Sequence, residues 1–203
     1  MKKLTKFLLP VILIVLFVLL FFCLKDIYSS LKSDQTVKTL DSIENYNYTL
    51  NEHDSDYFKE LFKELKDTLE NEQLDEEKYA SLVSQLFITD FYSLEKALSK
   101  SDIGGIQFVY DDYRETFTLK AKETVYAYVE SNIYGKREQV LPNITNVEVV
   151  NIEQKEYSGE KEEDEEAYYV DLEITYEEDL DYPTSCSLIL IHHDNKLEIV
   201  DMK

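Results

Sequence analysis

The chain has 203 residues and carries 42 acidic but only 21 basic side chains, a formal net charge of −21. Residues 25–203 hold 18 of the basic and all 42 of the acidic side chains, a net charge of −24. Such a domain repels phosphate backbones, so the composition argues against a nucleic-acid partner. The cysteines are Cys23 and Cys186. Because the first lies in an apolar run, we expect neither an intradomain disulfide nor a cysteine-based metal site.

Residues 7–24 form an apolar run without a charged side chain. As a helix, a run of this length spans about 27 Å at ~1.5 Å per residue, close to the thickness of the hydrocarbon core of a bilayer. Three lysines precede the run and Lys25 follows it. The run therefore predicts a transmembrane helix that anchors a single-pass protein, and the membrane is its first expected partner.

Two other interpretations of this run stay open. A cleaved signal peptide has a shorter apolar core followed by small residues at the cleavage site, whereas this run ends in Phe21, Phe22, Cys23 and Leu24. A lipoprotein signal would use Cys23, but Phe22 fills the position where a small residue is expected. The length of the run and the poor cleavage signals favour an uncleaved anchor.

The charges around the run predict its orientation. Lys2, Lys3 and Lys6 lie in the tail of residues 1–6, and positive charge favours the cytoplasmic side. We therefore expect a cytoplasmic N-terminus and an extracytoplasmic C-terminal domain at the cell membrane. The abundance of Lys, Ile, Asn, Glu and Tyr indicates a bacterial source. The reverse orientation would give a regulator that faces the cytoplasm.

Residues 25–54 are polar and predict a stalk or linker between the membrane and the folded domain. Within this stretch, the large side chains of Tyr46, Tyr48 and Leu50 alternate with the small polar ones of Asn47 and Thr49. Such alternation is typical of a brief strand. The folded domain is then expected over residues 55–203.

Three helices are expected at the start of this domain. The first begins near residues 54–56, whose side chains suit an N-cap, and the second begins at Asp75. The third runs from Phe108 to about Ile133, with Gly135 as its stop. In each helix, apolar residues recur at steps of three or four and predict a buried face. These residues are Phe58, Leu61, Phe62, Leu65 and Leu69; Tyr79, Leu82, Val83, Leu86, Phe87, Phe91 and Leu94; and Val109, Tyr113, Phe117, Ala121, Val125 and Tyr128.

After Pro142 the apolar residues alternate, which predicts strands. The alternation changes phase between Val149 and Val150, which predicts a β-bulge. Short connections such as residues 193–195 favour an antiparallel meander. The four predicted strands cover residues 143–156, 167–176, 185–191 and 196–202.

Helices followed by strands predict an α+β fold: a transmembrane helix, then about three helices packed on a curved, four-stranded antiparallel sheet. This order over residues 55–203, closing with the strand at 195–201, resembles the cone-shaped nuclear-transport-factor-two-like superfamily. In plan it is closest to the membrane-anchored assembly component of type IV secretion and conjugation machines. The resemblance carries no diagnostic motif. It implies a curved sheet that wraps a helix, with a pocket or groove for a ligand or partner, and it assigns no functional residue.

No motif for catalysis, phosphate binding or metal binding is present, so we assign no catalytic, cofactor-binding or metal-binding residue and expect no cofactor. Besides His53 there is the pair His192 and His193, which would point to opposite faces of a strand and could not share a metal. Gly104-Gly105 is interpreted as a helix–helix connection. The acidic run at 160–166 is expected to be a solvated hairpin loop, with a calcium site as the alternative.

Two further groups of side chains bear on function. An isomerase-like member of the superfamily would need a buried aspartate in an apolar pocket, and Asp90, Asp111 and Asp112 are the aspartates considered for that role. Tyrosine is also abundant, and it is enriched at protein interfaces. These tyrosines either line the edges of the core or form a protein-binding face: Tyr110, Tyr113, Tyr126, Tyr128, Tyr134, Tyr168, Tyr169 and Tyr176.

The sequence therefore predicts a membrane-anchored protein whose extracytoplasmic domain binds or scaffolds a protein partner, or forms a homo-oligomer, without catalysis. The alternative is a small-ligand binder or an enzyme that uses a buried pocket of the cone.

Overall fold

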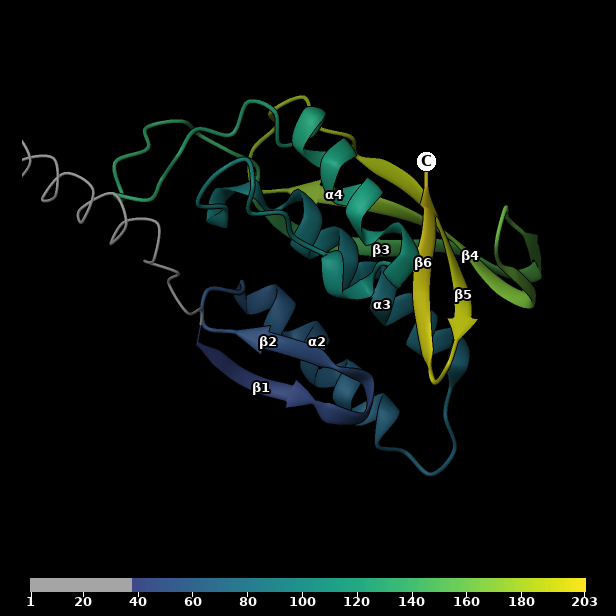
Figure 1. Cartoon of the computed structure of the whole chain (residues 1–203). Coiled ribbons are helices and arrows are strands. Elements are labelled where there is room, and N and C mark those ends of the chain that lie inside the picture. The colour runs from purple at the N-terminus through teal and green to yellow at the C-terminus, as the bar shows by residue number, and fades with distance from the viewer. Residues whose placement is uncertain (1–37) are drawn as a thin grey trace, which may run out of the picture. The chain divides into compact units, whose positions relative to one another are not determined.

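The structure, a computed structural model, describes residues 38–203. The predicted tail at 1–6, the predicted transmembrane helix at 7–24 and the first part of the predicted stalk lie outside the described residues. Between residues 38 and 203, no helix has both the length and the apolar character needed to cross a bilayer. Residues 39–203 form one compact unit with a single main core (Figure 1).

Two helices, α2 (Asp56–Leu69) and α3 (Glu76–Tyr92), begin where the sequence predicts. The side chain of Ser55 caps α2 by accepting a hydrogen bond from the amide of Phe58 at 3.1 Å. Asp75 caps α3 in the same way through the amide of Lys78, at 3.0 Å. Helix α2 buries one stripe, whereas α3 is buried on most sides because it packs against both α2 and the sheet.

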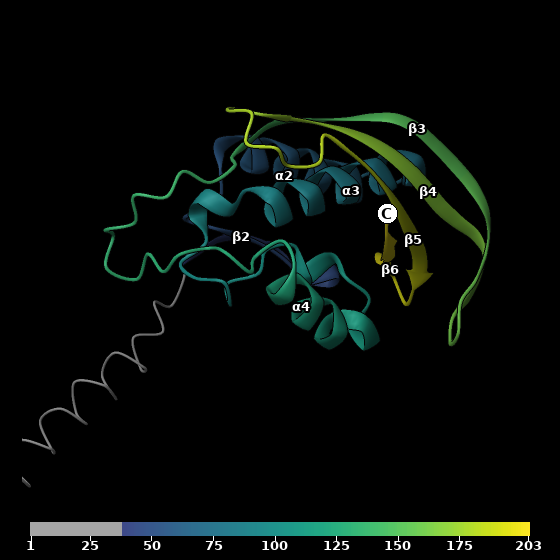
Figure 2. The same ribbon diagram turned by 90° about the horizontal axis from the view of Figure 1, so that it is seen from above.

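The sheet is antiparallel with strand order β3-β4-β5-β6, which confirms the predicted four-stranded meander. The predicted bulge is also confirmed, because the register shifts between Val149 and Asn151. Figure 2 shows β3 and β4 curving around the helical layer. The strands span Ile144–Ser158 (β3), Glu163–Tyr176 (β4), Ser185–His193 (β5) and Lys196–Met202 (β6).

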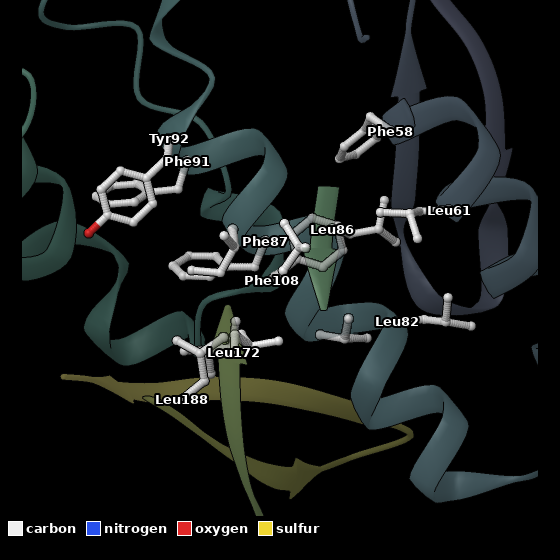
Figure 3. Close-up of a cluster of buried hydrophobic side chains, with 14 of the residues drawn as sticks. Phe58, Leu61, Leu82, Leu86, Phe87, Phe91, Tyr92, Phe108, Leu172 and Leu188 are labelled. Atoms are coloured by element: carbon white, nitrogen blue, oxygen red, sulfur yellow. The ribbon is translucent and has the colours of Figure 1, made fainter. Parts of the chain in front are cut away.

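The core lies between α3 and the concave face of the sheet. Large side chains of α3 point toward Leu172 of β4 and Leu188 of β5 (Figure 3). Leu86 and Phe87 are fully buried there, and burying each such side chain contributes about 1.5–3 kcal/mol. Phe108, from the 3₁₀ helix η3 (Ile106–Phe108), fills the same core.

The predicted stalk ends earlier than expected, because residues 39–54 belong to the compact unit. They form a two-stranded hairpin, β1 (Thr39–Ile43) and β2 (Tyr48–Asn51), joined by the 3₁₀ helix η1 (Glu44–Tyr46). Tyr48 is fully buried, and its hydroxyl lies 2.8 Å from that of Tyr79 on α3. The alternating piece therefore supplies a core residue, which its short length concealed.

The predicted third helix is wrong in extent: the regular helix α4 covers Arg114–Glu123, ten residues. At the N-terminal side, Val109 forms a parallel bridge with Ile199 of β6, and the amide of Tyr110 donates to the Ile199 carbonyl at 3.0 Å. The chain is extended at this bridge and makes a single 3₁₀ turn, η4 (Asp111–Tyr113), before α4 starts. Pairing with the sheet therefore overrides the helical periodicity.

The C-terminal side of the predicted helix is also replaced by turns. The ring of Tyr126 is buried, and its hydroxyl donates to the carbonyl of Phe91 at 2.7 Å and accepts from the amide of Gly104 at 3.0 Å. A straight helix through Thr124 could not make these bonds, and Thr124 has the non-helical dihedral angles φ −119° and ψ −96°.

Gly104-Gly105 connects helical segments, as the sequence predicts, and lies tightly against the end of α3. A Cβ atom on Gly104 would come within 2.1 Å of the carbonyl oxygen of Asp90, and Gly105 has a positive φ of 79°. Only glycine fits both requirements without strain.

Candidate functional site

A groove of about 430 Å³ runs between α4 and β6. Figure 2 shows α4 standing opposite β6, across the open end of the curved sheet. This volume is in the range of small-molecule and peptide-anchor pockets. The floor of the groove is apolar and contains Phe91, Val109, Phe117, Val125, Ile199 and Met202. The rim is polar and contains Asp112, Thr116, Lys120, Thr124, Lys161 and Asp201.

The groove exists because the segment before α4 is fixed to the edge of β6 at one point and then turns away. The bridge between Val109 and Ile199 holds this point. The guanidinium of Arg114 donates through Nε to the Val109 carbonyl at 2.8 Å and pairs with Asp111 at 2.6 Å. These contacts set the direction in which α4 leaves the sheet, so the space beyond Ile199 stays open.

The edge of β6 next to the groove already has hydrogen-bond partners. Leu197 donates its amide to the hydroxyl of Tyr79 at 3.1 Å and accepts at its carbonyl from Tyr48 at 3.3 Å. The amide of Met202 donates to the side chain of Asp201 at 2.9 Å. A partner in the groove would therefore be recognised chiefly by side-chain packing, and less by addition of a strand to β6.

The burial of Tyr79 has an electrostatic consequence. Desolvation raises its pKa to about 12, against the opposing hydrogen bonds from Tyr48 and Leu197. Its hydroxyl therefore stays protonated near neutral pH. The hydroxyl pair of Tyr48 and Tyr79 is thus a fixed structural bond and not a source of a nucleophile.

The charges on the rim of the groove balance. Lys161, at the tip of the β3–β4 hairpin, pairs with Asp112 at 3.5 Å, and Asp201 pairs with Lys203 at 3.1 Å. Among the residues that line the groove, Lys120 and Lys161 equal Asp112 and Asp201 in number. The mouth is therefore much less negative than the chain as a whole, whose net charge is −21. An apolar or weakly charged partner would meet little electrostatic repulsion there.

Tyr113 links the groove to a small aromatic cluster on the outer face of the sheet. Its ring packs edge-on against Tyr110, with ring centroids 5.3 Å apart. Tyr110 is buried against Ala167 and Ile191, and its hydroxyl donates to Glu162 at 2.6 Å. The Glu162 carboxylate raises the pKa of Tyr110. The hairpin tip is thereby fixed beside the groove.

The predicted tyrosine set divides into buried, lining and exposed members. Tyr110, Tyr126 and Tyr168 are buried, whereas Tyr128 and Tyr134 are 88% and 77% exposed. The intermediate members are Tyr113, which lines the groove, and Tyr169 and Tyr176. The buried members therefore belong to the core, and the exposed ones remain candidates for a protein-binding face.

The three histidine side chains do not point toward a common site. His192 lies 2.9 Å from Asp164 through Nδ1, and His193 lies 2.9 Å from Glu198 through Nδ1. His53 is exposed in a turn. Across residues 38–203, no three His, Cys, Asp or Glu side chains are arranged to hold a metal ion.

The acidic run is partly strand. The turn is short, with the amide of Gly159 donating to the carbonyl of Glu162 at 2.8 Å, and β4 already begins at Glu163. Asp164 is largely buried and accepts from the amide of His192 at 2.7 Å. Burial opposes the charge of Asp164, but its hydrogen bonds to His192 and Glu166 outweigh burial and lower its pKa. Two of the run's carboxylates, Glu162 and Asp164, therefore hold the hairpin in place.

The three aspartates considered as bases are all paired. Asp90 forms an ion pair with Lys96 and accepts from the amide of Gly105 at 2.6 Å. Asp111 pairs with Arg114, and Asp112 lies on the groove rim beside Lys161. Their surroundings are ionic, unlike the closed apolar pocket that raises the pKa of a catalytic carboxyl.

Sequence reasoning missed the residues that form the groove. The sequence pattern predicts Phe117 and Val109 in the buried face of a helix, and Val200 and Met202 in a regular strand. One signal was present: the apolar positions of β6 change phase after Ile199, and the structure has a register shift at this point. Such a bulge turns side chains toward the strand edge, where the groove lies.

No protein-family model, curated protein or solved structure matches this chain.

Proposed function

We propose that this chain is a single-pass, membrane-anchored protein whose domain at residues 39–203 binds a protein partner in the groove between α4 and β6. The groove carries the proposal. The groove has a volume of about 430 Å³ and an apolar floor. Its rim carries equal numbers of positive and negative side chains, although the chain as a whole is strongly acidic. Protein–protein interfaces have the same plan: their cores contain few charged residues, and their rims are polar.

The expected partner inserts large apolar side chains over Phe117 and Met202 and places polar groups near Lys120 and Asp201. Anchors of this type, buried in a preformed hollow, supply most of the free energy of typical protein interfaces. Tyr113, which also lines the groove, adds an aromatic ring with a hydroxyl group. Such a side chain suits an interface that is partly hydrated.

A binding role without catalysis agrees with the state of the titratable groups near the groove. Asp112 and Asp201 are paired with lysines, and Lys120 lies on the exposed face of α4. General acid–base catalysis needs a group positioned against the substrate with a pKa near the working pH. Salt-bridged rim carboxylates do not meet this description.

The membrane location is proposed from the sequence. Residues 7–24 would form the anchor, and Lys2, Lys3 and Lys6 would keep the N-terminus in the cytoplasm, so the domain would lie outside. A protease added to intact cells should then remove the domain. Protection of the domain would reverse the orientation and favour the cytoplasm-facing regulator.

A small apolar ligand is the second candidate for the groove, because its volume and its apolar floor also fit a drug-sized molecule. In this alternative the resemblance to the cone-shaped superfamily would extend to the use of a pocket. Mass spectrometry of the purified full chain under native conditions distinguishes the two candidates, since a bound small molecule adds a fixed mass without a protein partner.

Site-specific photo-crosslinking in cells tests the leading proposal. A photo-reactive amino acid at the exposed rim position Thr116 should yield a discrete adduct with a partner protein. The same amino acid at Thr145, which is exposed on β3 away from the groove, is the matched control. Thr116→Arg should abolish co-purification of that partner, whereas Thr145→Arg should not. Identical adducts from both positions, or none from Thr116, would contradict the proposal.

A further inference from the structure

The segment between α4 and β3, residues 124–143, exposes large apolar side chains. We call it the 124–143 loop. Half of the large hydrophobic residues that are exposed within residues 38–203 lie in it. They are Tyr128, Ile133, Tyr134 and Val140, with exposed fractions of 88%, 54%, 77% and 62%. Exposed apolar patches on a soluble protein usually mark an interaction site.

The exposure has a fixed structural origin. Arg137 donates from its guanidinium to the carbonyls of Ala97, at 2.6 Å, and of Glu95. The amide of Asn132 donates to the carbonyl of Leu98 at 2.8 Å. These bonds tie the loop to the segment that follows α3.

Bonds inside the loop hold its two arms together. Gln139 accepts from the amide of Glu130 at 2.9 Å and donates to the carbonyl of Tyr128 at 2.9 Å. The turn between the arms closes with the amide of Gly135 donating to Asn132 at 2.9 Å, and Gly135 has a positive φ of 64°. Ile133 and Tyr134 lie in this turn.

The loop also has a buried side. Val129 and Leu141 are each only 7% exposed and pack into the main core. The loop is therefore two-faced, with apolar residues that reach the core and a second apolar set that points away from it. Core packing explains why Val129 and Leu141 are apolar. It does not explain the exposed apolar residues, which make no contribution to the core.

The position of the loop indicates what the second set meets. In Figures 1 and 2 the loop and the start of β1 lie at the same end of the domain, opposite the tip of the β3–β4 hairpin. Leu40, at the start of β1, is also 49% exposed. Residues 25–38 connect Thr39 to the apolar run at 7–24 and can span at most about 50 Å when extended. A bilayer that holds this run would therefore be within reach of the loop.

The chemistry of the exposed set fits the surface of a bilayer. Tyrosine rings prefer the boundary between headgroups and acyl chains, where the ring is dehydrated and the hydroxyl stays wet. Lys136 and Arg137 balance Glu130 and Glu138 in the loop, so the loop itself carries no negative excess that would repel an anionic leaflet.

We propose that the 124–143 loop rests on the bilayer, with Tyr128, Ile133, Tyr134 and Val140 among the lipid headgroups, and thereby fixes the orientation of the domain. This inference rests on the proposed anchoring by residues 7–24. Anchoring makes the contact intramolecular, so a patch too small to bind vesicles by itself is sufficient. With this end on the membrane, the hairpin tip points away from it.

The chain contains no tryptophan, so a single introduced tryptophan is a specific probe. In the full chain reconstituted into phosphatidylcholine vesicles, Tyr134→Trp should show blue-shifted emission, strong quenching by brominated lipids and several-fold protection from acrylamide. Val150→Trp is the matched control, because Val150 is 51% exposed and lies within β3, outside the loop. Its emission should remain that of a residue in water.

Vesicle flotation separates this inference from the proposed anchoring. If the chain floats with the vesicles but the tryptophan of Tyr134→Trp stays exposed to water, the loop contact is wrong and the anchor stands. If the chain does not float, the anchor fails first. A blue shift that needs an added protein fraction instead of lipid would replace the bilayer by a protein as occupant of the loop, and would also overturn the inference.

Discussion

Along α3, the rings of Phe87 and Phe91 stack in parallel, with centroids 5.6 Å apart, and are buried in the main core. In the 124–143 loop, Tyr128 and Tyr134 are held in solvent by hydrogen bonds from Arg137 and Gln139. Burial of apolar area stabilises the first region, whereas charge-assisted and backbone bonds shape the second. The comparison separates residues that maintain the fold from residues that are available to a partner.

Truncation in the first region should have the largest effect. Phe87→Ala leaves a cavity beneath the sheet and removes contacts with Phe91 and Phe117, so we expect a loss of about 4 kcal/mol in the free energy of unfolding. Urea denaturation measures it. Leu119→Ala, at an exposed position of α4, should change the same free energy by less than about 0.5 kcal/mol. Equal losses would mean that α3 is not the centre of the core.

The buried ion cluster beside α3 should come next. Lys96 pairs with Asp54 at 3.0 Å and with Asp90, and both carboxylates are largely buried. Lys96→Met leaves them without their cation, which costs about 3 kcal/mol. Lys100→Met, at an exposed lysine, is the control.

The cluster also gives a pH dependence with a definite sign. Burial alone would lower the pKa of Lys96, but Asp90 and Asp54 outweigh burial and raise it above its ordinary value of 10.5. The stabilisation is therefore complete at neutral pH and is lost as the pH rises through the raised pKa. The stability difference between wild type and Lys96→Met should shrink in that alkaline range. A difference that grows there would contradict the assignment.

The second region should respond locally. Arg137→Ala removes the bonds to the carbonyls of Glu95 and Ala97, which contribute about 1.5 kcal/mol together as charge-assisted bonds partly open to water. Amide hydrogen exchange should accelerate over residues 128–140 and remain slow in α3. Lys136→Ala, next to it and exposed, should leave both unchanged. Faster exchange throughout the domain would mean that the loop is part of the core.

The same contrast explains what could be predicted from the sequence. The helices α2 and α3 and the strands β3 to β6 follow from local periodicity, because each buries a regular face. The groove and the loop depend on bonds between residues far apart in the sequence. Examples are Val109 with Ile199 and Arg137 with Ala97. Periodicity contains no information on such pairs, and the apolar spacing through residues 108–133 even suggested a continuous helix.

The smallest expected effect is at the exposed tyrosines, and it distinguishes the two regions most directly. The double variant Tyr128→Ser/Tyr134→Ser should change the free energy of unfolding by no more than about 0.5 kcal/mol, because both rings are already in water. Tyr126→Ser, the same change only two residues from Tyr128, should cost several kcal/mol, because it empties a core position and breaks the bond to the Phe91 carbonyl. Thermal denaturation of the three proteins compares them. If the double variant were as unstable as Tyr126→Ser, the exposed rings would have a structural task, and the reason for assigning them to a partner would disappear.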